Sequence, residues 1–76
     1  MEVFKSWGRE RYVKLSEAEE GKYRIRRVKN EKLMELGFVP GRGIEVVRRG
    51  RGRLVIVIKG EKFAVAEEIA EGIEVD

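Results

Sequence analysis

Short alternations of apolar and polar residues, separated by glycines, run through most of this chain. In residues 22–28 the apolar side chains fall on one face, and a bend is expected near Arg27 because Val28 leaves the alternation. Residues 43–49 alternate in the same way. A period of two residues is typical of strands that bury one face. Further strands are predicted over residues 12–15, 53–59, 62–65 and 73–75.

The most apolar segment runs from Leu54 to Ile58 and carries no polar residue on either face. A strand of this kind is normally covered on both sides, so we expect it in the middle of the sheet. The residues before it, Gly50-Arg51-Gly52, predict a short hairpin loop, and Gly60 is expected to end the strand.

A short helix is predicted over residues 31–36. Asn30 is a favourable N-cap for it, and Gly37 stands where helices often end in a left-handed conformation. The spacing of the apolar residues in this helix assigns them to the core of the protein. These residues are Leu33, Met34 and Leu36.

Three further turn signals complete the pattern. Pro40-Gly41 predicts a type II turn, because proline presets φ at the first central position and glycine accepts positive φ at the second. Ser16, with Glu19 three residues later, predicts a capping box and one helical turn that ends at Gly21. A last turn of helix is predicted over residues 66–71.

These elements predict a mainly β fold of five to six short strands with one short helix. A sheet this small exposes unpaired edge strands unless it curls on itself. We therefore expect a small SH3-like barrel. The 76 residues suffice for one core, which we assign to residues 12–76. Residues 1–11, with Phe4 and Trp7, form an N-terminal arm without an assigned role. This arm, or an uncovered strand edge, is expected to be where two copies would associate.

The composition argues against an enzyme, because the chain contains no histidine and no cysteine. Its only non-phenolic hydroxyls belong to Ser6 and Ser16, which have no histidine to activate them. The adjacent pairs Glu19/Glu20 and Glu67/Glu68 are expected at the surface. No cofactor loop and no metal-ligand spacing is recognised, so we predict no catalytic residue, no cofactor and no metal ligand.

Charged residues make up 41% of the chain, and residues 22–53 alone hold 11 Lys or Arg against 3 Asp or Glu. A solvated surface is the simpler interpretation of this basic segment, and a nucleic-acid surface is the alternative. The scarcity of amide side chains together with high Lys, Arg and Glu is typical of thermophiles. The longest apolar run is far too short to span a membrane, so we expect a cytoplasmic protein without membrane insertion.

The segment Lys32-Leu33-Met34-Glu35-Leu36-Gly37-Phe38-Val39-Pro40-Gly41 resembles the motif of the FeoA family, ferrous iron transport protein A. Leu15 to Gly21 is similar to the opening segment of that family, and the segment from Leu54 to Ala70 is similar to its closing strands and helical turn. The resemblance covers roughly residues 13–75. Residues 1–11 and the absence of histidine depart from the family's pattern.

The resemblance implies an SH3-like barrel in the cytoplasm that acts as an accessory or regulatory component of a FeoB-type ferrous iron transporter. It also implies a link to transition metal ion binding, because the same barrel occurs in iron-dependent repressors. A nucleic-acid-binding barrel and a metal-sensing domain are therefore the alternative functions. The residues that we predict to bind a protein partner are Arg24, Arg26, Arg27, Phe38, Val39, Pro40, Arg48, Arg49, Arg51 and Arg53.

Overall fold

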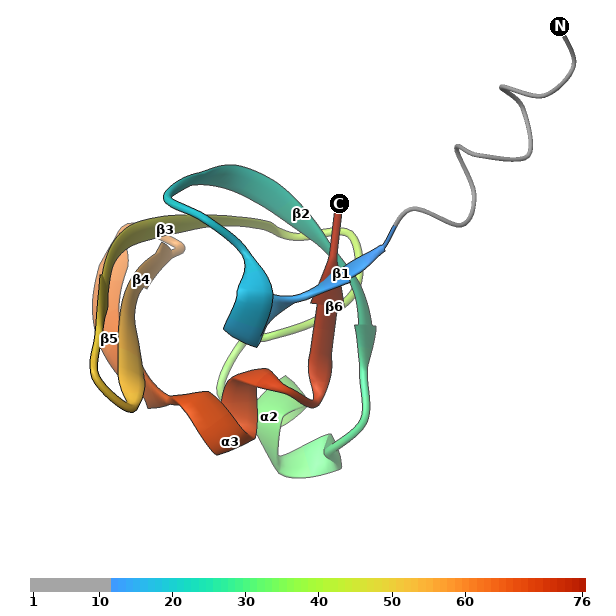
Figure 1. Cartoon of the computed structure of the whole chain (residues 1–76). Helices are drawn as coiled ribbons and strands as arrows, with labels where there is room; N and C mark the ends of the chain where they lie inside the picture. The colour runs from blue at the N-terminus through green and yellow to red at the C-terminus, as the bar shows by residue number, and fades with distance from the viewer. Residues whose placement is uncertain (1–11) are drawn as a thin grey trace, which may run out of the picture.

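The computed structural model describes residues 12–76 (Figure 1). A long strand of its sheet bends, so that each half of the strand pairs with a different neighbouring strand. The first half of strand β2 (Gly21–Val28) pairs with β3 (Gly43–Gly50), and its second half pairs with β6 (Ile73–Val75). The register of β2 shifts between Ile25 and Arg27, which confirms the predicted bend. The arm predicted over residues 1–11 lies outside the described residues.

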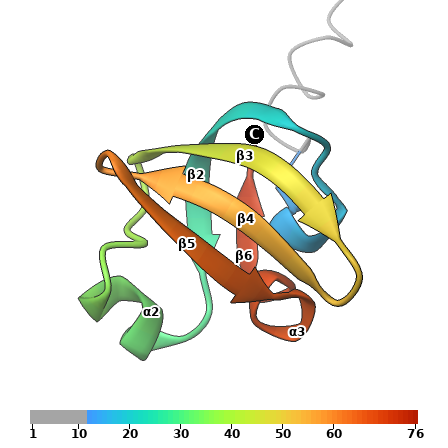
Figure 2. The ribbon, with the colours of Figure 1, turned by 90° about the vertical axis from the view of Figure 1, so that its left-hand side faces the viewer.

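All strand pairs are antiparallel, in the order β1-β6-β2-β3-β4-β5. The sheet curls into a small barrel, and the short helices lie at one end of it (Figures 1 and 2). The predicted strands are therefore confirmed. The remaining elements are β1 (Val13–Lys14), the 3-10 helix η1 (Leu15–Glu17), α2 (Glu31–Glu35), β4 (Arg53–Ile58), β5 (Glu61–Ala66) and α3 (Glu67–Ala70).

The barrel interior is filled by apolar side chains from strands β2 to β6, whereas both residues of β1 are exposed. Ile25 from β2, Ile56 from β4 and Ile73 from β6 are completely buried. Strand β4 lies between β3 and β5, as an internal strand should. Its outer face is not covered, however, because Val55 and Val57 are only half-buried. The expectation that β4 is buried on both faces was wrong, since neither α2 nor α3 packs substantially against β4.

Helix α2 begins and ends as predicted. The Asn30 side chain accepts a hydrogen bond from the backbone N–H of Lys32. At the other end, the N–H of Gly37 donates to the carbonyl of Met34, and the N–H of Phe38 donates to that of Leu33. These two bonds form a Schellman motif, which satisfies carbonyls that the helix leaves free.

Three details of the helical segments differ from the prediction. Leu36 is 61% exposed and Met34 is also exposed, so of the three apolar residues of this segment only Leu33 joins the core. Leu33 is the one buried residue of this short helix, and Leu36 lies beyond its last residue, at the C-cap. The capping box was also wrong, because Ser16 lies inside η1 and no side chain caps that turn.

Gly37→Ala is expected to destabilise the protein by about 1–2 kcal/mol, because Gly37 has φ of 108° and a side chain with a Cβ disfavours that conformation. The added Cβ would meet no atom closer than 3.4 Å, so the cost is conformational and not steric. Gly72→Ala is the control, since Gly72 has no positive φ and its Cβ would meet ordinary contacts. Urea unfolding of both variants measures the difference, and equal stability would contradict this account.

Candidate functional site

The predicted partner-binding residues do not form one surface. They divide into arginines of β2, arginines of the β3–β4 hairpin, and the turn after α2. Each group has different neighbours, and these neighbours decide which side chains are available to a partner.

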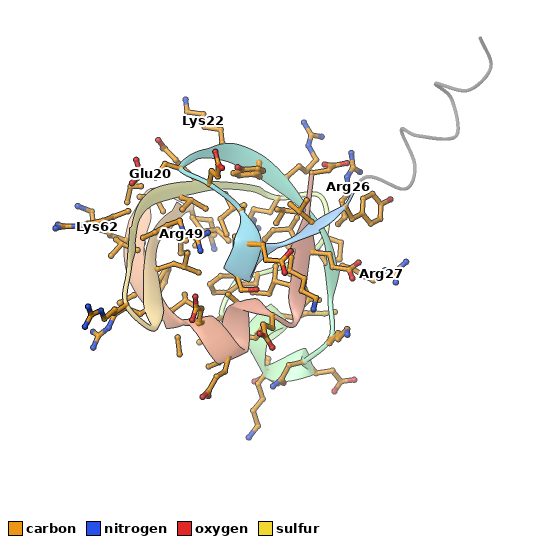
Figure 3. All side chains as sticks on the ribbon, viewed as in Figure 1. Glu20, Lys22, Arg26, Arg27, Arg49 and Lys62 are labelled. Carbon is orange, nitrogen blue, oxygen red and sulfur yellow. The ribbon has the colours of Figure 1, made fainter. Side chains whose placement is uncertain are left out.

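The arginines of β2 lie on the outside of the barrel, where Arg26 and Arg27 project away from it (Figure 3). Arg26 Nε lies 2.8 Å from Asp76 Oδ2, and Arg27 Nε lies 3.5 Å from Glu74 Oε1. The hydrogen bond to Asp76 and the charge of that carboxylate raise the pKa of Arg26 above its ordinary value. Both ion pairs are accessible to solvent, so each contributes little to the stability of the fold. They nevertheless neutralise much of the positive charge of the β2 arginines that were predicted to bind a partner.

Arg24 and Lys22 keep their charge at the surface beside these pairs. They line a shallow cleft of about 640 Å³ between β2 and the turn before β3, and Asp76 closes one side of it. The cleft is polar and wide open, and it contains a carboxylate as well as basic groups. It offers general electrostatic attraction and no defined anion site.

The side chain of Arg49 is directed toward η1 (Figure 3), although the residue as a whole remains exposed. Its Nη2 donates to the backbone carbonyl of Ser16 at 2.9 Å, and its Nη1 donates to that of Ala18. The guanidinium thus joins β3 to a segment more than thirty residues away in sequence. Arg49 has a structural role, and its prediction as a partner-binding residue is not supported by this position.

The other arginines of the hairpin, Arg48, Arg51 and Arg53, are exposed, and we call them the hairpin arginine cluster. Strand pairing places Arg48 opposite Val55 and Gly50 opposite Arg53, and the three side chains border a hollow of about 300 Å³. No acidic residue occurs between Glu45 and Glu61. Within residues 12–76, no carboxylate lies within 4.0 Å of this cluster.

The turn after α2 does not expose the predicted apolar rim. Phe38 is only 2% exposed, and its ring packs on Phe63 with centroids 6.0 Å apart. Val39 is half-buried, and Pro40 is exposed. Pro40-Gly41 forms the predicted type II turn, in which Gly41 has φ of 94° and the N–H of Arg42 donates to the carbonyl of Val39. Phe38 is therefore a core residue, and its expected role as a contact was wrong.

An apolar groove that the sequence analysis missed lies on the other side of Phe38, between α2, β5 and α3. Its volume is about 140 Å³, and Leu36 and Ile69, which is 46% exposed, form its walls. The signal in the sequence was the presence of large apolar residues at these positions, but the pattern assigned Leu36 to the core. The remaining lining residues are Leu33, Phe38, Phe63, Ala64, Val65 and Ala66.

The polar groups of these surfaces are mainly charged side chains and backbone groups. Among residues 12–76, no three His, Cys, Asp or Glu side chains lie close enough together to hold a metal ion. In the same residues, no buried side-chain polar atom lacks a hydrogen-bond partner. No helix in the described part of the chain is long and apolar enough to cross a membrane. What the surface offers is charge, apolar area and strand edges, which are the means of molecular recognition.

The fold defines a small SH3-like domain. The family model of the FeoA domain matches residues 13–76, and the chain therefore belongs to the FeoA family, which is associated with ferrous iron transport. No curated protein matches the chain.

Several solved structures of FeoA proteins are similar to this chain. An iron uptake regulatory protein, FeoA, is 31% identical, with a TM-score of 0.76 over 84% of this chain and 93% of its own. The iron(II) transport protein A of Clostridium thermocellum is 33% identical, with the same TM-score over 84% of this chain and 44% of its own. FeoA of Stenotrophomonas maltophilia, a prokaryotic SH3 domain protein complexed with zinc, is 25% identical, with a TM-score of 0.74 over 84% and 89%.

IdeR of T. acidophilum shares the fold alone, with a TM-score of 0.73 and 19% identity over 86% of this chain and 33% of its own. It adds no functional residue to this chain.

Proposed function

We propose that this chain is a cytoplasmic, non-catalytic accessory module of ferrous iron transport that binds the cytoplasmic part of a FeoB-type transporter. Membership of the FeoA family supports the link to iron transport. The observation that carries the binding role is the hairpin arginine cluster, because its three guanidinium groups have no acidic neighbour within the described residues. Such groups are available to a partner's carboxylates.

The position of the cluster suits recognition. The two-residue turn at Arg51 and Gly52 joins strands that pair from Glu45 to Val57, so the backbone under the arginines is held by a hydrogen-bond ladder. Arginine presents a planar fork that matches a carboxylate and loses less freedom per hydrogen bond than lysine does. Unpaired charges on a rigid element also raise the rate of association with an oppositely charged partner.

The contrast with the rest of the basic segment supports this choice. Arg26, Arg27 and Arg49 already have partners in the chain, so they contribute less to an interface. A surface that binds single-stranded nucleic acid would be expected to interleave aromatic side chains with its basic ones. Residues 48–53 contain no aromatic residue, so an acidic protein surface is the better match.

The test is the affinity for the transporter's cytoplasmic domain, measured by calorimetry at low salt. Replacing Arg48, Arg51 and Arg53 together by glutamine is expected to weaken binding at least ~10-fold, because all three lie at one interface. The charge-matched control replaces Lys14, Lys22 and Lys29 by glutamine and should change affinity less than ~3-fold.

Two results would contradict the proposal. One is the absence of binding by the unmodified chain at low salt, both with and without guanine nucleotide. The other is an equal loss in the two triple variants, which would mean that only net charge matters. Tight binding of a labelled oligonucleotide with a steep salt dependence would instead favour the nucleic-acid alternative.

A further inference from the structure

Strand β5 is one of the two edges of the sheet, because within residues 12–76 it pairs with β4 alone (Figure 2). Six residues of this strand are in ladder register with β4, from Glu61 opposite Ile58 to Ala66 opposite Arg53. An edge strand of this length offers backbone groups to another strand.

The hydrogen-bond pattern tells which residues of β5 direct their backbone outward. The N–H of Glu67 donates to the carbonyl of Gly52, a bond that flanks the pair of Arg53 and Ala66. That pair is consequently of the non-hydrogen-bonded type, and the type alternates along an antiparallel ladder. Phe63 and Val65 are bonded to β4, whereas Lys62 and Ala64 direct their N–H and C=O groups to the edge. Ala66 directs only its N–H there, because its C=O begins α3 as the N-cap residue.

These edge groups make no other backbone contact within residues 12–76. None of the hydrogen bonds found outside the regular ladders and helices of these residues involves the backbone of Lys62, Ala64 or Ala66. Lys62 and both alanines are exposed, and the small alanine side chains leave the edge accessible. An incoming strand therefore meets no bulky side chain over Ala64 and Ala66.

The apolar groove follows the same edge. Four consecutive residues of β5, 63–66, line it, with Leu36 on one wall and Ile69 on the other. A strand added to β5 would bring alternate side chains beside this groove. Backbone bonds and a neighbouring apolar pocket are the two elements of recognition by strand addition.

The charge around the groove indicates what kind of strand would fit. The segments that flank it, 31–35 and 67–71, hold five glutamates and one lysine, in a chain whose net charge is +3. Glu67, Glu68 and Glu71 of the α3 segment are all exposed. A segment with apolar side chains and flanking Lys or Arg complements this surface.

We propose that an extended, apolar and basic segment of the transporter's cytoplasmic part adds as a strand to the free edge of β5, with apolar side chains in the groove. This inference rests on the proposed function and assigns the groove a role separate from that of the hairpin arginine cluster. It names a second contact, of opposite charge preference, on the same accessory module.

Ala64→Pro is the first test, with the full chain and the transporter's cytoplasmic domain. Proline removes an N–H that β4 does not use, and prolines are tolerated on edge strands, so the barrel should remain folded. We expect binding to weaken at least ~10-fold, since the added strand loses a bond and meets the proline ring. Ala64→Ser keeps the N–H and is the control, with an expected change below ~2-fold. Thermal unfolding verifies that both variants are folded.

The second test concerns the chemistry of the occupant. Leu36→Lys and Leu36→Glu remove the same apolar wall and add opposite charges at an exposed position. Both substitutions should weaken binding. The affinity of the lysine variant should be at least ~3-fold lower than that of the glutamate variant, because the added lysine repels a basic segment. The reverse order would overturn the assignment of a basic occupant.

Hydrogen exchange of the edge amides separates the remaining outcomes. Amides of Lys62, Ala64 and Ala66 should exchange rapidly in the chain alone and at least ~10-fold more slowly with the transporter domain. Protection that rises with the concentration of the chain alone would assign the edge to a second copy and overturn the inference. Protection that is lost when Phe4 and Trp7 are replaced by serine would assign it to the arm, with the same consequence.

The two proposals can fail separately. If the transporter domain binds and Ala64→Pro binds equally well, strand addition is wrong and the proposed function stands. If the domain does not bind the unmodified chain at all, both are wrong.

Discussion

Ile56→Ala is expected to lower the free energy of unfolding by about 2–5 kcal/mol. Ile56 is completely buried in the middle of β4, between β3 and β5, and the cavity left by its side chain cannot collapse because the ladders hold the strand on both sides. A domain of this size has a stability of only about 5–10 kcal/mol, so the loss is a large part of the total. Urea unfolding followed by circular dichroism measures it.

Leu36→Ala is the matched control for that experiment. It removes a side chain of equal size from the same chain, but Leu36 is mostly exposed, so we expect a change below about 0.5 kcal/mol. If the two substitutions cost the same, Leu36 belongs to the core after all, and the groove that it borders does not exist in solution.

Arg49→Gln should destabilise the protein by about 1.5–3 kcal/mol, although it removes a charge from the most basic part of the chain. The guanidinium donates to the carbonyls of both Ser16 and Ala18, and hydrogen bonds that involve a charged group contribute more than neutral ones. Loss of these bonds releases η1 and the residues that follow it from β3.

Arg51→Gln separates this contact from a general effect of charge. It changes the net charge by the same amount, two residues away, at the exposed tip of the hairpin. We expect Arg51→Gln to leave the stability unchanged or to raise it slightly, since it removes one positive charge from among the neighbouring arginines. Thermal unfolding of the two variants in the same buffer decides, and equal melting temperatures would show that the Arg49 contacts are without energetic value.

The regular elements could be predicted because local chemistry specifies them. The alternation in residues 22–28 and 43–49 requires strands, the Asn30 side chain can cap only the turn that follows it, and Pro40-Gly41 favours one turn type. These are interactions between residues close in sequence, so a single pattern is enough. The expected SH3-like barrel followed from the number and shortness of the strands.

The candidate site was predicted less well, because exposure depends on residues distant in sequence. Leu36 and Phe38 are both large and apolar and stand two positions apart, yet one is exposed and the other packs on Phe63 from β5. Arg48 and Arg49 are adjacent and chemically identical, but the register shift in β3 beside them sends only Arg49 toward η1. Nothing local distinguishes the members of either pair.

The sequence by itself determined that this is a small mainly β domain, with its strands, the Asn30 cap and the Pro40-Gly41 turn in place and with the motif of the FeoA family. Only the tertiary structure decided which arginines are available to a partner, which apolar residues form a groove, and that β5 is the edge beside it. The reason is physical: propensity and periodicity act over a few residues, whereas pairing order, burial and charge neutralisation arise from contacts between segments that the chain brings together only when it folds.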